Sequence, residues 1–173
     1  YEPYDTVSSF YDYQSIRLCD PDNDKIIYHD LDLSALLNGE DAEKATRPNV
    51  TRYIRYASEQ DGILYVSFGH NGYAEDETDS NYVAAIDLSD NTVLWKSEPL
   101  ICSSDNFIIE TDALICGYGS DEGESCICVL NLCDGSLNQK IPVHSAPEVF
   151  GMKDDDLYVC TYDTEYVFSV TFG

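Results

Sequence analysis

Apolar and polar residues alternate along most of this chain in short segments separated by turns rich in Asp, Asn and Gly. Three of these segments share one plan: an alternating strand, a turn that opens with a small residue and Asp, and a second strand. They are Ile86–Trp95, Leu130–Leu137 and the slightly longer Ile16–Ile27. Asp at the start of a turn can accept hydrogen bonds from the backbone two residues on, and Asn or Gly tolerates positive φ. The pattern therefore predicts three β-hairpins.

A second unit, a polar turn followed by an apolar strand, also recurs. Its copies are Asp61–Phe68, Thr111–Tyr118 and Asp155–Tyr162. A short strand precedes each copy, at 51–56, 106–110 and 148–152. A last strand at Tyr166–Phe172 matches 82–88 and 126–132. Each repeat thus contains four short strands in a fixed order.

The spacing of the repeats predicts the architecture. Ile86 and Leu130 are 44 residues apart, and Leu130 and Val170 are 40 apart. Four short antiparallel strands every 40 to 50 residues are typical of a β-propeller blade, whose sheet needs neighbouring blades to cover both faces. We therefore expect an all-β chain built from β-propeller blades of four antiparallel strands, forming a partial or small propeller. An antiparallel β-sandwich is the alternative.

The blade boundaries follow from the same pattern. We expect a single propeller domain or segment with blades at about 8–31, 51–100, 105–143 and 147–173, and an insertion at 32–50. Within the insertion, Ser34–Gly39 is consistent with one helical turn closed by Asn-Gly. The first and last blades are incomplete. The interpretation we favour is a segment of a larger propeller, and the alternative is a ring closed by pairing of the terminal strands.

The second blade resembles the quinoprotein-like (PQQ-like) repeat. It contains Asp61–Val66, Tyr82–Leu88 and Thr92–Trp95, where that repeat has a Gly-x-Leu/Val-Tyr-Val strand, an Ala-Leu-Asp strand and a terminal Trp. Asn91-Thr92 replaces the usual Thr-Gly, and Gln139 stands at the Trp position of the third blade. The resemblance implies the propeller fold but not the cofactor, because fold does not determine function.

The repeat also predicts which side chains are buried. We expect burial at six repeat-equivalent positions: Ile86, Leu88, Leu130, Leu132, Val170 and Phe172. Trp95 is the single Trp of the chain, and we expect it to pack between adjacent blades, where the PQQ-like repeat places its Trp.

Charge narrows the range of partners. The chain has 33 Asp and Glu against 9 Lys and Arg, a formal net charge of −24. Proteins bind phosphate backbones through Lys and Arg, so we expect no nucleic acid partner and no anionic membrane partner. No run of apolar residues is long enough to span a bilayer. The Tyr-rich, Lys-poor composition is consistent with an extracytoplasmic bacterial protein, either secreted or a surface-anchored lipoprotein.

The seven cysteines do not form a clean disulfide framework, since their number is odd. Cys126 and Cys128 lie on one face of an alternating strand, and Cys116 and Cys160 lie within apolar strands. Buried free cysteine packs as a small hydrophobe, and we expect most of the seven to be free thiols. Cys133 could join Cys126 and Cys128 at a metal, but neither a CxxC pair nor a nearby His supports such a site.

Two acidic segments are candidate binding elements. Asp20, Asp22 and Asp24 have the spacing that opens a calcium loop, although Lys25 and Leu31 replace its Gly and terminal Glu. Only a weak calcium site is expected there, and no other cofactor. The second segment is the loop at 70–80, whose candidate binding residues are His70, Tyr73, Glu75, Asp76, Glu77 and Asp79.

No catalytic motif stands out in the sequence. The three histidines are scattered, and there is no HExxH, phosphate loop or nucleophile elbow. We therefore expect a non-catalytic, extracytoplasmic propeller module that binds a protein or small ligand through its loops. Two alternatives remain: part of a larger enzyme whose catalytic residues lie outside this chain, and a structural scaffold in an envelope assembly protein.

Overall fold

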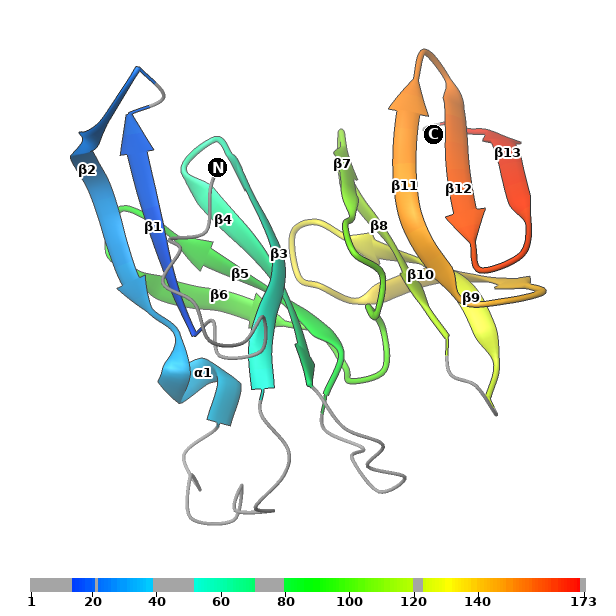
Figure 1. Cartoon of the computed structure of the whole chain (residues 1–173), viewed down its shortest axis with the longest axis horizontal. Helices are drawn as coiled ribbons and strands as arrows, with labels where there is room; N and C mark the ends of the chain where they lie inside the picture. The colour runs from blue at the N-terminus through cyan, green and yellow to red at the C-terminus, as the bar shows by residue number, and fades with distance from the viewer. Residues whose placement is uncertain (1–13, 21, 39–51, 71–79, 120–122, 172–173) are drawn as a thin grey trace.

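The computed structural model describes residues 14–20, 22–38, 52–70, 80–119 and 123–171. Most of these residues lie in strands, and the one helix among them is the five-residue α1 (Ser34–Asn38). The strands form four antiparallel sheets that follow one another along the chain and across the molecule (Figure 1). The expected all-β architecture of propeller blades is confirmed, as is the helical turn in the insertion.

Each sheet is a hydrogen-bonded meander in chain order. The first contains β1 (Ser15–Asp20) and β2 (Asn23–Asp32). The second contains β3 (Arg52–Gln60), β4 (Ile63–His70), β5 (Tyr82–Asp87) and β6 (Thr92–Lys96). The third contains β7 (Ile108–Glu110), β8 (Ala113–Tyr118), β9 (Ser125–Asn131) and β10 (Leu137–Val143). The fourth contains β11 (Pro147–Lys153), β12 (Asp156–Thr161) and β13 (Glu165–Ser169).

Alternation along the strands supplies an apolar layer to both faces of the inner sheets. On β4, Leu64 and Val66 pack toward the first sheet, whereas Tyr65 packs toward the third. On β8, Cys116 packs toward the second sheet and Ile115 toward the fourth. Successive side chains of a strand point to opposite faces, so one four-stranded sheet joins two separate cores. This stacking of sheets through three cores is the propeller arrangement expected from the repeat.

Repeat-equivalent positions can be read from three matching backbone hydrogen bonds. The amides of Leu88, Leu132 and Val170 each donate to the turn between the first two strands of their sheet, at Gly62, Asp112 and Asp155 respectively. Val170 is therefore equivalent to Leu132. The sequence alignment that matched Val170 with Leu130 was wrong by two residues. Ile86, Leu88 and Leu130 are buried, Leu132 and Val170 are partly buried, and Phe172 lies outside the described residues.

Trp95 packs between the second and third sheets, as the sequence predicts. Its side chain is only 8% exposed and belongs to the core between these sheets. The indole Nε1 donates to the carbonyl oxygen of Leu132 at 2.9 Å. Gly135, in the turn after Leu132, lies directly against the indole ring. Trp95 thus joins the outer strand of one blade to the hairpin turn of the next.

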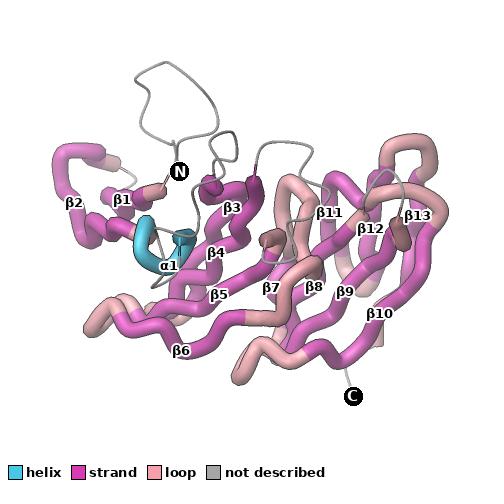
Figure 2. The backbone as a smooth tube through the Cα atoms, turned by 90° about the horizontal axis from the view of Figure 1, so that it is seen from below, coloured by secondary structure: helices cyan, strands magenta, loops and turns pink. Residues whose placement is uncertain are grey.

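The two ends of the blades differ. At one end, which we name the turn face, tight connections such as Asp61-Gly62 and Asp154-Asp155 join the first strands of each sheet. At the other end, the loop face, lie α1, the ends of the 70–80 loop at His70 and Ser80, and the connections between successive sheets (Figures 1 and 2). Both insertions of the repeat therefore begin or end on the loop face.

Candidate functional site

The segment between β6 and β7, residues 97–107, lies on the loop face, and we name it the interblade loop. Its backbone contacts three sheets in turn. The amide of Ile101 donates to Asn81 of the second sheet, that of Ser103 to Gly117 of the third, and that of Asp105 to Glu148 of the fourth. Such a loop fixes the relative placement of three blades and gives the loop face a rigid frame.

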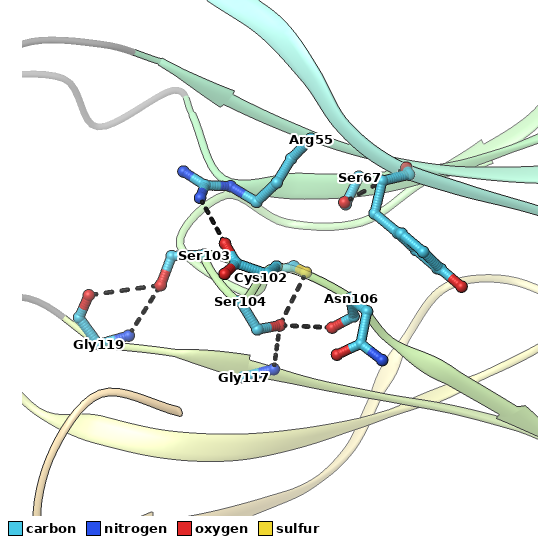
Figure 3. Close-up of polar contacts among 10 residues, drawn as sticks. Arg55, Ser67, Cys102, Ser103, Ser104, Asn106, Gly117 and Gly119 are labelled. Atoms are coloured by element: carbon cyan, nitrogen blue, oxygen red, sulfur yellow. Dashed lines mark hydrogen bonds and ion pairs between the residues drawn. The ribbon is translucent and has the colours of Figure 1, made fainter. Parts of the chain in front are cut away.

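Two serines and an asparagine complete this framework (Figure 3). Ser104 Oγ accepts from the Gly117 amide at 3.2 Å and donates to the Asn106 carbonyl at 2.8 Å. Ser103 Oγ accepts from the Gly119 amide at 3.1 Å. The Asn106 side chain exchanges two hydrogen bonds of 2.8 Å with the backbone of Phe150, as a neighbouring strand would.

Cys102 is a buried thiol of the interblade loop with polar neighbours. Its Sγ lies 3.6 Å from Ser104 Oγ, and the side chain is fully buried. A hydrogen bond from Cys116, together with Ser104, Arg55 and Ser67, lowers the pKa of the Cys102 thiol. Burial raises the pKa of Cys116, whose thiol donates to the carbonyl oxygen of Ile101 at 3.5 Å. The surroundings thus shift the pKa values of the two thiols in opposite directions.

Arg55 lies next to the interblade loop, near Cys102 and Ser103 (Figure 3). Its guanidinium Nη1 is 3.5 Å from Asp105 Oδ1, an ion pair between a largely covered arginine and an exposed carboxylate. The guanidinium also packs over the Gly69 backbone and within 5.4 Å of the centre of the Tyr53 ring. Partly exposed ion pairs of this kind stabilise by less than about 1 kcal/mol. The Arg55 charge also contributes to the lowered pKa of Cys102.

A second thiol pair lies in the same core. Cys126 and Cys128 point to the same side of β9, as their spacing predicts, with their Sγ atoms 3.6 Å apart. A hydrogen bond from Cys128, helped by the charge of Lys140, lowers the pKa of Cys126 to about 7. The same hydrogen bond and burial raise the pKa of Cys128. Four buried thiols therefore gather between the second and third sheets: Cys102, Cys116, Cys126 and Cys128.

All seven cysteines lie in the described residues and all are free thiols. Titration with a thiol reagent after denaturation without reductant is therefore expected to find at least three thiols, and up to seven in freshly prepared protein. A bulky aromatic thiol reagent should reach the four clustered thiols only after unfolding, because their side chains are buried. A count of one would mean three disulfides and would contradict the packing of these thiols as free groups.

The expectation that strand cysteines are buried fails at Cys160. This residue is exposed on β12, whereas its equivalents in the second and third sheets, Ser67 and Gly117, face a neighbouring sheet. Cys133 is also exposed, and its backbone amide donates to Asn131 Oδ1 within the hairpin turn. It takes no part in the Cys126 and Cys128 pair.

One cluster of Ser, His and Asp on the loop face could be mistaken for a hydrolytic triad. Ser145 Oγ bonds Asp163 Oδ1 and lies 2.8 Å from Thr161 Oγ1, while His144 Nδ1 lies 3.3 Å from Asp163 Oδ2. A nucleophilic serine requires a base that bonds its hydroxyl and is itself oriented by a third group. Here the serine and the histidine both bond the carboxylate, so the histidine is not placed as the base that activates the Ser145 hydroxyl. The cluster instead joins the loop before β11 to the loop after β12.

The proposed calcium residues form part of a hairpin turn. Asp20 Oδ1 accepts from the amides of Asp22 and Asn23 at 2.9 and 3.1 Å, and Oδ2 accepts from Tyr28 Oη at 2.5 Å. The Tyr28 hydroxyl and these amides lower the pKa of Asp20. The side chain of Asp24 lies outside the described part of the structure. A weak calcium site in this turn remains a prediction.

Of the predicted loop residues, the structure describes only His70, the last residue of β4, whose backbone pairs with Arg52. Tyr73, Glu75, Asp76, Glu77 and Asp79 lie outside the described residues. Across the described ranges, no group of three or more His, Cys, Asp or Glu side chains is arranged to hold a metal ion. In the same ranges, no helix has the length and apolar character to cross a bilayer.

Comparison with known proteins bears on the fold. The computationally designed proteins Ika4 and Ika8 superpose on 91% of this chain with TM-scores of 0.55, at 14% and 16% identity. BamB from Moraxella catarrhalis overlaps 65% of the chain at a TM-score of 0.44 and 18% identity. This chain spans 81% of Ika4, 40% of Ika8 and 30% of BamB. No family model matches the sequence, and no curated protein is significantly similar to it.

These likenesses define a class of fold and nothing narrower. At such low identities the superpositions on Ika4 and Ika8 show shared architecture alone, and the shorter overlap with BamB adds nothing to it. The chain is built of β-propeller blades, and the quinoprotein-like repeat read from the second blade is consistent with that fold. Activity and partner must be argued from this chain's own residues.

Proposed function

We propose that the chain is a non-catalytic, extracytoplasmic propeller module that binds a ligand through its loop face. The observation that carries the proposal is the asymmetry between the two ends of the blades. The turn face has tight connections, whereas both insertions of the repeat begin or end on the loop face. In repeat proteins, insertions concentrated on one face often mark the binding face, and a rigid frame positions them.

The ligand chemistry that best suits this face is a cationic protein segment. The chain carries a net charge of −24, and the 70–80 loop contributes Glu75, Asp76, Glu77 and Asp79. Charge of one sign on a surface attracts and steers partners of the opposite sign. A calcium ion held by the same residues is compatible with this proposal.

Titration of the protein with a ten-lysine peptide, followed by calorimetry at physiological ionic strength, tests the proposal. A loop-face variant replaces Glu75, Asp76, Glu77 and Asp79 by the corresponding amides. A turn-face variant replaces the exposed residues Asp22, Asp61, Asp112 and Asp155 by Asn. The two variants lose the same amount of negative charge. We expect the loop-face variant to bind at least about tenfold more weakly than the parent protein, and the turn-face variant to change less than about twofold.

The two variants distinguish binding at the loop face from attraction to the overall negative charge. Equal weakening of both variants would mean that the peptide follows only the overall charge, and it would overturn the proposal. If the parent protein did not bind the peptide, the proposal of a cationic ligand would be overturned.

A second observation favours the alternative that the chain belongs to a larger ring. Tyr158 on the outward face of the fourth sheet is 42% exposed, whereas its repeat equivalents Tyr65 and Ile115 are each 3% exposed. Val167, its cross-strand neighbour, is 59% exposed. In the inner sheets a following blade covers these positions. We infer that a further blade packs here, as in a larger scaffold or an enzyme whose catalytic residues lie outside this chain.

Matched substitutions at equivalent positions test this inference in the chain as it stands. Tyr65→Ser is expected to lower the free energy of unfolding by about 3 kcal/mol or more, because it opens a cavity between two blades. Tyr158→Ser is expected to change it by less than about 0.5 kcal/mol. Denaturant unfolding of both variants measures the difference. A large cost at Tyr158 would mean that its face is already covered within this chain.

A further inference from the structure

The thiol cluster between the second and third sheets is not required by the repeat. In each of the last three sheets, one cross-strand pair occupies an equivalent place on the face that packs against the preceding sheet. These pairs are Val66–Ala84, Cys116–Cys128 and Val159–Tyr166. Valine, alanine and tyrosine therefore meet the packing demand at these places, and only the third sheet uses sulfur. Cys126 and, from the interblade loop, Cys102 add two more thiols to the same core.

Within this cluster, Cys126 and Cys128 have the closest geometry. Their Sγ atoms are 3.6 Å apart and both side chains are buried on one face of β9. Two residues of an extended strand span roughly 6.6–6.8 Å. That span is at the upper limit of the Cα separations that a disulfide bridges, roughly 4.4–6.8 Å. Side chains two residues apart point the same way, so their Cβ atoms are about as far apart as the Cα atoms and exceed the roughly 3.5–4.5 Å that a disulfide allows. A bond between these sulfurs therefore requires β9 to bend out of its extended conformation.

We propose that Cys126 and Cys128 form an oxidisable dithiol, which hydrogen peroxide converts reversibly to an intrastrand disulfide. Cys126 attacks one peroxide oxygen as the thiolate, the O–O bond breaks, and the departing hydroxide takes up a proton as water. The Cys126 sulfur, oxidised by two electrons, is then a sulfenic acid. Cys128 attacks that sulfur, the S–O bond breaks, and the hydroxyl leaves with the Cys128 proton as a second water. Two thiols and one peroxide thus give one disulfide and two waters.

Cys126 is the attacking sulfur because of its surroundings. Lys140 is half-exposed, forms an ion pair with Glu124 at 3.3 Å, and places positive charge near the Cys126 thiol. The hydrogen bond from Cys128 and this charge bring the pKa of Cys126 to about 7, so much of it is thiolate at neutral pH. Thiolate beside a cation is the reactive form of cysteine. The oxidation rate should therefore rise with pH through about 7 and level off above it.

The strain makes the bond reversible. Strained disulfides are more reducible than relaxed structural ones, and they are the labile members of their class. Because Cys128 pairs with Cys116 on β8 and with Lys140 on β10, closing the bond perturbs the middle of the third sheet. Oxidation is expected to lower the melting temperature, and dithiothreitol to restore it.

The experiment treats the intact chain with a small excess of hydrogen peroxide, quenches it, and counts thiols after denaturation. We expect the count to fall from seven to five, with Cys126 and Cys128 joined in a single disulfide-linked peptide by mass spectrometry. Cys128→Ala adopts the residue found at the equivalent position of the second sheet, Ala84, so it should fold; it is expected to abolish the two-thiol loss. Cys160→Ser, at an exposed cysteine outside the cluster, is the matched control and should keep that loss.

Each other outcome overturns the proposal. A disulfide mapped to Cys102–Cys116 or Cys116–Cys128 would assign the reactivity to a different pair. Loss of Cys133 and Cys160 thiols alone would mean that burial protects the cluster and that its sulfurs only pack. Peptide mapping of the parent protein decides among these outcomes without any variant, and none of them depends on the ligand of the loop face.

Discussion

Replacing Trp95 with alanine is expected to lower the free energy of unfolding by about 3–5 kcal/mol. The indole fills the interface between the second and third sheets and donates a hydrogen bond to Leu132 across it. Its removal opens a large cavity and leaves that carbonyl without its partner, and both effects destabilise the folded chain. Denaturant unfolding followed by far-UV circular dichroism measures the change, since the variant has no Trp.

The parent protein offers an independent check on the same contact. Its single Trp is 8% exposed, so its fluorescence emission is expected to be blue-shifted in the native state and to move to the red on unfolding. Trp95→Phe keeps part of the packing and should cost less than Trp95→Ala. A cost below about 1 kcal/mol for Trp95→Ala would show that Trp95 does not hold the two blades together.

Gly135→Ala is expected to be the most damaging single-methyl change, at about 2–4 kcal/mol. Gly135 has φ +70°, a conformation that costs L-residues about 1–2 kcal/mol, and an added Cβ would collide with the Trp95 ring. The contact ties the hairpin turn of the third sheet to the outer strand of the second. Chemical unfolding of the variant measures the cost.

Alanine substitutions at two other glycines distinguish the cost of backbone strain from the cost of a side-chain collision. Gly62 has φ +80° but open space around it, so Gly62→Ala should cost about 1–2 kcal/mol from strain alone. Gly151 has neither feature, and Gly151→Ala should change stability by less than about 0.5 kcal/mol. If Gly135→Ala cost no more than Gly62→Ala, the Trp95 ring would not be seated against this turn.

The repeat made much of the fold predictable. Periodic alternation and Asp-rich turns located the hairpins around Asp90 and Asp134, whose carboxylates accept from the Thr92 and Ser136 amides in the structure. The position of Trp95 in the repeat also identified its contact between blades. These predictions succeeded because period-two alternation and turn chemistry are local properties of the chain.

The register of the last blade and the state of Cys160 were not predictable in the same way. The final repeat is shorter, so alignment by spacing placed Val170 beside Leu130 when its backbone bond makes it equivalent to Leu132. Cys160 lies in an apolar strand, but the blade that would cover its face is not part of this chain's described sheets. Burial on an outward face depends on a neighbour that local sequence does not specify.

The candidate site was only partly visible in the sequence. Cys126 and Cys128 could be placed on one face by their spacing, but the approach of Cys102 depends on a loop with no regular pattern. Asn106 and Ser104 were equally hidden, because their bonds to Phe150 and Gly117 join sheets that are distant in the chain. Such contacts arise from the stacking of blades and have no periodic signature.

Hydrogen exchange of the backbone amides, followed by mass spectrometry on the native protein, tests the blade architecture most directly. Middle strands of separate four-stranded sheets are hydrogen-bonded on both sides, so we expect the slowest exchange in β4, β5, β8 and β9. The outer strands β6, β10 and β13 should exchange faster, because one edge of each is unpaired in the described sheets. Exchange in β6 and β10 as slow as in β5 and β9 would mean that the sheets are joined edge to edge, and it would contradict a stack of propeller blades.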